Sequence, residues 1–369
     1  MPKYKFGDVV REIKINIDRN NNPYEFYIAG EHMDTNELHL QRRGTFEGSD
    51  VGPAFIRLFK PGQILYGSRR TYLRKVAVAD FEGITSNTTF VLESKDETKL
   101  CQRLLPFIML SDDFTQYSIS KSKGSTNPYI LFSDLSEYEL DLPEIEQQRA
   151  LADILWALDD TKKAYRNLII STDELVKSQF IEMFSGVKVQ SRLDELCAFF
   201  GDGDWIESKD QSPSGIRLIQ TGNVGNGEYK EKGERARYIS EETFQRLNCT
   251  EIKEGDVLIS RLPDPIGRAC ILPAIPKSIT AVDCTIVRFK EHILPSYFVA
   301  MTKTPLYTAQ IDAFTTGSTR KRVSRANLGS ILVPVPEMSL QMEFVAIAQQ
   351  SDKSKFNVQI AIYRDVQGM

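Results

Sequence analysis

The spacing of apolar residues divides the chain into four stretches. Residues 1–142 and 186–335 carry short apolar runs separated by turn residues such as Gly and Pro, a texture typical of strands in an α/β fold. Residues 143–185 and 336–369 carry apolar residues at helical spacing instead, and Glu144–Phe184 contains neither Gly nor Pro. The pattern therefore predicts two globular domains, each followed by a helix.

Within each globule, the apolar runs predict strands, and longer amphipathic stretches predict helices. Lys-Pro-Gly and Lys-Glu-Gly triplets precede two of these runs, where glycine suits the positive φ of a tight turn. The predicted strands are Phe55–Leu58, Ile64–Tyr66, Lys75–Ala79, Thr88–Leu92, Ile216–Ile219, Val257–Ile259, Ala269–Leu272 and Thr285–Phe289. The predicted helical patches are Thr98–Asp112 and Pro295–Ala313. We expect a mixed α/β fold for both globules.

The segment Glu144–Phe184 predicts one long helix. Pro143 suits a helix start, and apolar residues recur every seven positions, as at Leu151 and Leu158. At 1.5 Å per residue the helix would be about 60 Å long, which favours a strut. Glu337–Gly368 is a weaker version of the same pattern. We expect the two helices to pack antiparallel; ordinary surface helices, one on each globule, are the alternative.

The two globule–helix pairs are copies of one another. The turn glycines Gly62 and Gly255 are 255 − 62 = 193 residues apart, and the Gly-Ser-Thr triplets beginning at Gly124 and Gly317 are 317 − 124 = 193 apart. A constant separation across distant blocks indicates a tandem duplication. Because this period far exceeds the roughly 20–50 residues of a solenoid repeat, each copy must be a whole domain with its connector.

Composition removes several function classes. Lys+Arg 46 against Asp+Glu 50 gives a formal net charge of −4, so binding of nucleic acid would depend on a local basic surface. No apolar stretch approaches the roughly 20 residues of a membrane span, and the N-terminal residues lack a signal-peptide pattern. The five cysteines have no CxxC spacing, and the three histidines are scattered. We expect reduced thiols, no metal site and a cytoplasmic location.

The sequence carries no catalytic pattern. Asn127-Pro128-Tyr129 resembles part of the catalytic tetrapeptide of amino-methyltransferases, but one proline is missing and the aligned second-copy residues are Arg320-Lys321-Arg322. The glycines between Gly222 and Gly227 lack the Lys-Ser/Thr ending of a phosphate-binding loop. We therefore expect a non-catalytic chain.

The start of the long helix resembles a known family. Leu142–Gln148 reads LPEIEQQ and leads into ALADILWALDDTKKA, which resembles the spacer motif of Type I restriction–modification specificity subunits. The Gly-Ser-Thr triplets, each followed by a leucine (Leu135, Leu328), resemble the ends of that family's target recognition domains. The resemblance covers nearly the whole chain. The second spacer motif, VPEMSLQMEF, departs from the family at Met338 and Met342.

This resemblance implies target recognition domains at 1–142 and 186–335, a central spacer helix at 143–185 and a C-terminal spacer helix at 336–369. Each recognition domain would read one half of a bipartite, gapped double-stranded DNA target. The helices would form an antiparallel coiled coil that sets the gap and docks two modification subunits, with restriction subunits joining through the complex. AdoMet, Mg and ATP would be bound by those partners, and no cofactor by this chain.

Basic and hydroxyl residues beside the repeated turns are the candidates for DNA contact, because Lys and Arg neutralise phosphates and Arg also reads guanine. Solvated surface charge is the alternative for each. The candidates are Arg69, Arg70, Lys75, Lys121, Lys123, Ser125, Thr126, Arg261, Arg268, Ser318, Thr319, Arg320, Lys321, Arg322 and Arg325. The docking surface that the resemblance implies comprises Leu151, Leu155, Leu158, Tyr165, Leu168, Ile169 and Leu175.

Two other functions stay open at this point. One is a specificity-type subunit of another defence methyltransferase system, and the other is a coiled-coil adaptor that does not bind DNA. The target sequence cannot be read from the chain, because α/β readers follow no simple residue-to-base code.

Overall fold

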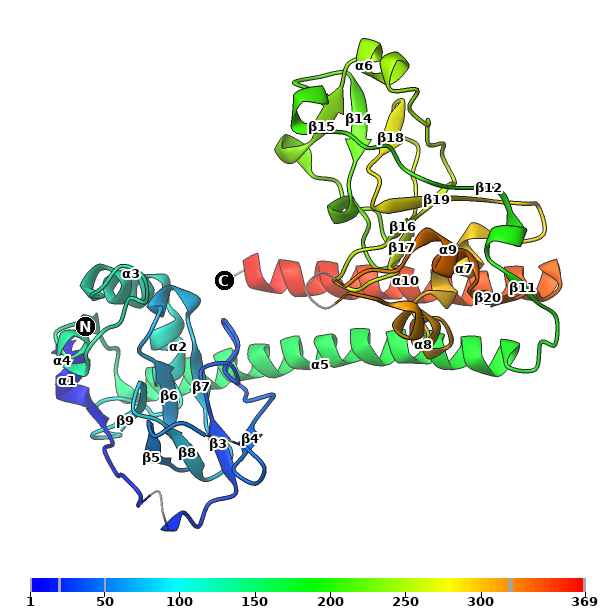
Figure 1. The fold of residues 1–369 in the computed structure, drawn as a ribbon. Helices are drawn as coiled ribbons and strands as arrows, with labels where there is room; N and C mark the ends of the chain where they lie inside the picture. The colour runs from blue at the N-terminus through cyan, green and yellow to red at the C-terminus, as the bar shows by residue number, and fades with distance from the viewer. Residues whose placement is uncertain (1, 19–20, 50, 318–320, 368–369) are drawn as a thin grey trace. The chain divides into compact units, whose positions relative to one another are not determined.

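The chain divides within a helix. The computed structural model describes residues 2–18, 21–49, 51–317 and 321–367, and contacts group the chain into unit 1 (Met1–Thr161) and unit 2 (Lys162–Met369) (Figure 1). The boundary falls inside helix α5 (Ile145–Phe184), which runs out of unit 1 and into unit 2.

The described residues of unit 1 form two four-stranded sheets and a two-stranded ribbon. Sheet β2-β9-β6-β7 is antiparallel, sheet β4-β3-β8-β5 contains the parallel pair β3–β8, and the ribbon is β1-β10. The strands are β1 (Lys3–Lys5), β2 (Val10–Glu12), β3 (Phe26–Ile28), β4 (Gly44–Thr45), β5 (Phe55–Phe59), β6 (Ile64–Gly67), β7 (Val76–Val78), β8 (Gly83–Ser86), β9 (Thr89–Ser94) and β10 (Glu139–Asp141). The helices before α5 are α1 (Phe6–Val9), η2 (Thr71–Leu73), α2 (Leu105–Leu110), α3 (Asp112–Lys121) and α4 (Phe132–Leu135).

Unit 2 repeats this topology. Its antiparallel sheet is β12-β19-β16-β17, its second sheet β13-β15-β14-β18 contains the parallel pair β14–β18, and its ribbon is β11-β20. The strands are β11 (Gln190–Arg192), β12 (Cys197–Asp202), β13 (Gln211–Ser212), β14 (Ile216–Ile219), β15 (Arg237–Ile239), β16 (Val257–Ser260), β17 (Ala269–Ile271), β18 (Ser278–Thr280), β19 (Cys284–Phe289) and β20 (Leu332–Pro334). The helices are η3 (Asp194–Leu196), η4 (Ser208–Asp210), η5 (Thr221–Asn223), η6 (Gly233–Arg235), α6 (Glu241–Arg246), α7 (Pro295–Met301), α8 (Pro305–Phe314), α9 (Arg325–Gly329) and α10 (Met338–Gln367).

All eight predicted strands are present, but both predicted helical patches are wrong in their bounds. The patch Thr98–Asp112 begins too early, and it ends where α3 begins, because the Ser111 hydroxyl accepts the backbone N–H of Phe114 and caps a new helix there. The patch Pro295–Ala313 is two helices, α7 and α8. Proline at the first position of α8 suits a helix start and cannot continue the preceding helix.

Aromatic side chains form much of each core. In unit 1, Phe6 and Phe114 are fully buried with ring centroids 5.3 Å apart. In unit 2, Phe180 of α5 lies 5.2 Å from Phe344 of α10 and 5.5 Å from Tyr297 of α7. The C-terminal part of α5 and the start of α10 are therefore part of the unit 2 core.

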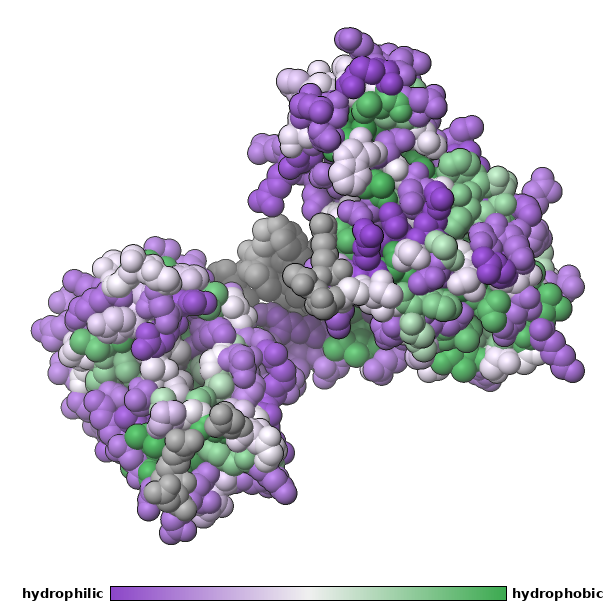
Figure 2. All heavy atoms as spheres, viewed as in Figure 1, coloured by the Kyte–Doolittle hydropathy of each residue, from purple (hydrophilic) through white to green (hydrophobic). Residues whose placement is uncertain are grey.

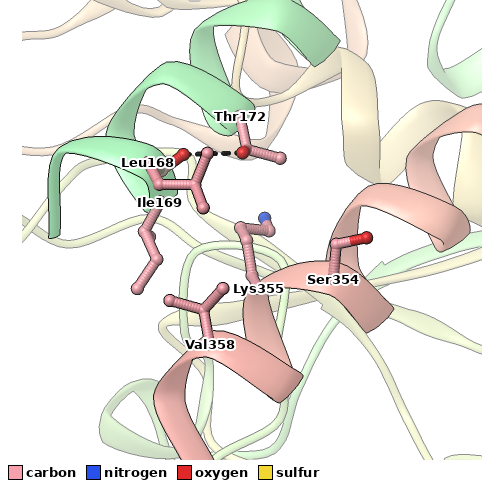
Figure 3. A pocket seen from close by; sticks show the side chains of 6 residues that line it. All are labelled: Leu168, Ile169, Thr172, Ser354, Lys355 and Val358. Atoms are coloured by element: carbon pink, nitrogen blue, oxygen red, sulfur yellow. Dashed lines mark hydrogen bonds between the residues drawn. The ribbon is translucent and has the colours of Figure 1, made fainter. Parts of the chain in front are cut away.

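Farther along, α5 and α10 stay in contact and run in opposite directions. Lys355 Nζ lies 2.6 Å from Asp173 Oδ1, and Figure 3 shows Leu168 and Ile169 of α5 facing Val358 of α10 across a small pocket. Residues nearer the start of α5 therefore contact residues nearer the end of α10, as in an antiparallel pair. No helix among the described residues combines the length and apolar character that a membrane span requires.

A buried glutamine joins the globule of unit 1 to its helix. Gln148 Oε1 accepts the backbone N–H of Cys101 at 3.0 Å, and Nε2 donates to the carbonyl oxygens of Lys99 at 2.8 Å and Pro143 at 2.9 Å. The side chain is buried, so its amide partners the buried N–H of Cys101 and two partly buried carbonyls. This amide fixes the first turn of α5 against the segment before α2.

Unit 2 has the same device at the same separation. Gln341, which is 341 − 148 = 193 residues later, accepts the N–H of Leu294 at 2.9 Å and donates to the carbonyls of His292 at 2.9 Å and Pro336 at 3.0 Å. Each partner is again 193 residues beyond its unit 1 counterpart. The last glutamine of the spacer motif is therefore a structural residue that ties each globule to its helix.

We predict that Gln148→Leu destabilises unit 1 by at least about 2 kcal/mol, because it leaves the buried N–H of Cys101 and two partly buried carbonyls without partners. Gln341→Leu should have the same effect on unit 2. Urea unfolding of the full chain, followed by hydrogen exchange in each unit, measures both effects. The control Gln147→Leu lies at the exposed neighbouring position and should change stability by less than about 0.5 kcal/mol. Similar losses for Gln147→Leu and Gln148→Leu would contradict the assignment.

Candidate nucleic-acid interface

Two loops meet at one end of the antiparallel sheet in unit 1. The loop from β6 to β7 and the loop that carries Gly-Ser-Thr are joined by backbone hydrogen bonds. The N–H of Arg70 donates to the carbonyl of Pro128 at 2.7 Å, and the N–H of Ile130 donates to that of Ser68 at 2.9 Å. The two loops therefore form one continuous surface.

The Gly-Ser-Thr loop of unit 1 is closed at its base. Lys123 and Tyr129 exchange two backbone hydrogen bonds, at 2.7 and 2.9 Å, and Gly124 takes the positive φ that the turn needs, 87°. Ser125 and Thr126 are exposed between these ends. The frame holds two hydroxyl groups in solvent, where they can donate to an anionic oxygen.

The corresponding loop of unit 2 has the same frame. Thr316 and Arg322 exchange backbone hydrogen bonds at 3.0 and 2.9 Å, and the N–H of Val323 donates to the carbonyl of Arg261 at 3.3 Å. Thr316 and Arg322 are each 193 residues beyond Lys123 and Tyr129. The predicted contacts Ser318, Thr319 and Arg320 lie outside the described residues.

Arginines and an aromatic ring project from the joined loops of unit 1. Arg69 and Arg70 are exposed; the guanidinium of Arg69 is 5.9 Å from the ring centre of Tyr129, and Arg70 Nε donates to Asn127 Oδ1 at 3.2 Å. Arg70 also has a left-handed backbone, with φ 52°, which arginine rarely adopts. The structure thus brings the predicted Arg69 and Arg70 together with a tyrosine.

The two predicted lysines beside this surface differ in their partners. Lys121 is exposed, with its ammonium 5.7 Å from the ring centre of Tyr117. Lys123 Nζ lies 2.8 Å from Asp134 Oδ2, and this hydrogen bond holds the pKa of the Asp134 carboxyl below its usual range. A phosphate would have to compete with Asp134 for Lys123, whereas Lys121 forms no ion pair with another of the described residues.

In unit 2 the exposed predicted residues are Lys321, Arg322 and Arg325. Arg325 begins α9, and its Nη1 lies 3.8 Å from Asp202 Oδ2. Because both groups are solvent-accessible, this ion pair contributes little stability and leaves the arginine available.

The predictions for Arg261 and Arg268 need correction because both side chains are buried, whereas Lys75 is half-buried. Arg268 is 9% exposed, and its guanidinium donates to the carbonyls of Thr221, Val224, Leu262, Pro263 and Pro265. Arg261 is also buried, and it donates to Val282 O at 2.6 Å and lies 3.5 Å from Asp202. Lys75 is 268 − 75 = 193 residues before Arg268 and donates to the carbonyl of Gly30. Arg261 and Arg268 hold loops together inside the fold, and Lys75 ties its loop to Gly30 at the surface.

The sequence pattern did not predict three exposed aromatic residues. Tyr72, Tyr129 and Trp205 are 52%, 38% and 71% exposed. Large exposed aromatics are uncommon on a free surface and serve in recognition by stacking or apolar contact. Their positions beside turn residues were the signal that the sequence offered. The pattern of apolar residues, however, does not distinguish a buried aromatic ring from an exposed one.

One group of residues in unit 1 has the donor chemistry of a metal site. Ligand atoms of Glu37, His39 and Asp159 all lie within 4.8 Å of one another, and His39 Nε2 is 2.9 Å from Asp159 Oδ2. The histidine–carboxylate contact alone accounts for the closeness of these two side chains, and it ties the loop before β4 to α5. Asp159 is far from Glu37 and His39 in sequence, so the sequence pattern did not indicate the cluster.

The predicted docking residues of α5 divide into two sets. Leu155 packs against the cluster of Cys101 and Leu104 in its own unit, and Ile169 lines the pocket beside α10. Leu151, Leu168 and Leu175 are exposed, as are further apolar residues on α5. Figure 2 shows exposed apolar residues over the part of unit 2 that contains α8 and the end of α5. Leu158 and Tyr165 are half-buried.

Comparisons with known proteins were made by family and by structure. The family model of the Type I restriction modification DNA specificity domain matches the chain twice, over residues 5–170 and 186–362. The HindI specificity subunit of Haemophilus influenzae is 24% identical over 187 residues, covering 49% of this chain and 40% of the relative. The EcoDI specificity subunit of Escherichia coli is 30% identical over 132 residues, covering 35% and 29%. The matched segments therefore span less than half of either relative's length.

Two solved structures share the fold. A chain from a study of complex assembly and conformational transition of the type I R-M system aligns with a TM-score of 0.60 at 17% identity, covering 99% of this chain and 94% of that one. The Type I restriction–modification S subunit from M. genitalium aligns with a TM-score of 0.55 at 14% identity, covering 99% and 92%. At these identities the likeness concerns the fold alone.

We predict that Arg268→Met destabilises unit 2 by about 3 kcal/mol or more, because buried carbonyl oxygens lose their charged donor. Thermal and urea unfolding of the full chain measure the loss. Arg322→Met, at an exposed position in the same unit, is the matched control and should leave stability within about 0.5 kcal/mol of the wild type. If Arg268→Met were as stable as the control, Arg268 would not be structural.

Proposed function

The chain belongs to the Type I restriction–modification DNA specificity family, and from this premise we propose that it reads a bipartite, gapped DNA target for a complex that contains two modification subunits. The observation that carries the proposal is the loop frame found twice. In each unit the base of the Gly-Ser-Thr loop is closed by the same pair of backbone hydrogen bonds, and one equivalent bond, Ile130 N–H to Ser68 O or Val323 N–H to Arg261 O, joins it to the strand-to-strand loop, 193 residues apart. Two copies of one surface suit two half-sites.

Phosphate contacts would come from exposed groups on these joined loops. In unit 1 they are Lys121, Ser125 and Thr126, and in unit 2 Lys321 and Arg322. The chain as a whole carries a net charge of −4, so attraction to DNA depends on these local cations. Binding should therefore weaken as salt rises, because counterions released from the duplex drive association.

The two long helices would hold the recognition units at a set separation. The observed contacts between α5 and α10 within unit 2 support an antiparallel coiled coil. A helix of 40 residues is about 60 Å long, enough to separate readers by more than the roughly 34–36 Å of one DNA turn. The DNA between the half-sites would then go uncontacted and could affect binding only through its shape.

The exposed apolar stripe of α5, which comprises Leu151, Leu168 and Leu175, would dock the modification subunits. Restriction subunits would join through the same complex. Catalysis would belong to these partners, together with the AdoMet, Mg and ATP that methylation and ATP-dependent cleavage need. The chain itself would be a non-catalytic, cytoplasmic subunit. Its domain boundaries would be 1–142 and 186–335 for the readers, with 143–185 and 336–369 for the spacer helices.

We predict that co-expression of the chain with its modification subunit produces adenine methylation at a two-part gapped motif, mapped across the host genome. Exchange of residues 1–142 for another recognition domain should change one half of that motif only, because each reader has its own loops and core. Omission of the chain is the control and should abolish the motif. A change in both halves would contradict independent readers, and a stable complex with no DNA binding would favour an adaptor role.

We predict that Leu151→Glu and Leu175→Glu each weaken binding of a modification subunit at least about tenfold, because a charge replaces an exposed apolar contact. Affinity of the purified full chain for the modification subunit measures the effect. The control Ser178→Glu, on an exposed position of the same helix, should bind normally. Normal binding by both leucine variants would exclude this stripe as the docking surface.

A further inference from the structure

One loop keeps its frame in both units but changes its chemistry. The loop from β6 to β7 in unit 1 and the loop from β16 to β17 in unit 2 have equal lengths and equivalent ends. The register is the same, since Ile64 pairs with Val78 and Val257 with Ile271, each 193 residues on. Between these anchors, 69–72 reads Arg-Arg-Thr-Tyr and 262–265 reads Leu-Pro-Asp-Pro.

The residues that flank the variable tetrapeptides support the loops in both units. The carbonyls of Ser68 and Arg261 accept equivalent hydrogen bonds from Ile130 and Val323. At the other end, Lys75 and Arg268 donate to backbone carbonyls, as described above. The position before this cation has a positive φ in both units, 49° at Arg74 and 81° at Gly267. The residues that support the loop are therefore equivalent in the two units, whereas the residues at its tip differ. Two domains that read different DNA sequences would require this combination.

The tip of the unit 1 loop has guanine-reading chemistry. Arg70 is exposed and keeps a left-handed backbone that glycine would adopt without strain, so the side chain is retained despite the conformation. Asn127 accepts from Arg70 Nε and so orients the guanidinium plane. A guanidinium held in this way still offers its two terminal nitrogens, which match guanine O6 and N7.

The tip of the unit 2 loop has the opposite chemistry. The position equivalent to Thr71 is Asp264, which is exposed and acidic in the middle of the tetrapeptide. A carboxylate accepts hydrogen bonds and repels phosphate, so it fits a base edge that presents an amino donor, such as cytosine N4. An acidic tip would be unfavourable for a loop that only contacted the DNA backbone.

Resting on the proposed function, we infer that residues 69–72 and 262–265 are the base-reading elements of the two units, and that the Gly-Ser-Thr loops contact phosphate. Arg70 selects guanine in the first half-site, and Asp264 selects a base with an amino donor in the second. Lys75 and Arg268 are positioning residues that hold the reading loops and do not touch the bases.

The test uses the full chain in complex with its modification subunit, with methylation mapping and DNA-binding measurements for each variant. Arg70→Lys keeps the charge but loses the planar fork, and should relax one guanine position of the first half-site by roughly 5- to 150-fold. Arg70→Gly removes the side chain and suits the left-handed backbone, so it covers the case in which another variant misfolds. Asp264→Asn should change the second half-site only.

Matched controls lie at the other end of the same strands. Lys60→Ala and Lys253→Ala remove exposed charges from the turns that precede β6 and β16, and should leave the motif unchanged. Ser125→Ala should weaken binding equally for all DNA sequences, with the motif intact.

Several outcomes would overturn the inference. A wild-type first half-site without a G·C pair would exclude guanine reading by Arg70. An unchanged motif in both Arg70 variants would assign Arg70 to phosphate contact if affinity fell, and to no contact if it did not. Failure of the wild-type complex to bind any DNA is a separate result, because it would refute the proposed function itself.

Discussion

The architecture of this protein depends on one buried amide in each copy. Gln148 and Gln341, each on the first turn of a long helix, satisfy three backbone groups, one just before that helix and two on the segment that leads into α2 or α7. A buried backbone group without a partner is costly, so the helix cannot leave its globule at another angle without breaking these hydrogen bonds. These hydrogen bonds therefore fix the junction between each globule and its long helix.

Under the proposed function, a fixed junction matters because two readers would have to be placed on one duplex. If each reader could rotate freely on its helix, the second half-site would be found at many separations and directions. Lys75 and Arg268 likewise hold a loop in each unit, Arg268 from the interior and Lys75 from a half-buried position. The two glutamines and Arg268 place polar groups in the interior, where they stabilise one geometry and leave the exposed tips free to vary.

The net charge of −4 is consistent with a division between residues that support the fold and residues that are exposed at the loop tips. Cations that a charge count treats alike have different roles in the structure: Arg268 is buried among carbonyls, Lys123 is paired with Asp134, and Arg70 is exposed. Of these, the buried Arg268 is not available to a phosphate, whereas an exposed cation is. Sequence composition therefore says little about where this chain would bind a duplex, and nothing about which base each unit would read.

The sequence by itself determined the duplication, eight of the strands and the two long helices, because these depend on residue spacing along the chain. The 193-residue separation also places Gln148 and Gln341 at equivalent positions. Only the tertiary structure decided which side chains face solvent. Arg268 and Arg322 both follow turn residues in the second copy, yet one is buried because its partners come from 221–224 and 262–265. Burial is set by residues distant in sequence, and spacing along the chain cannot report it.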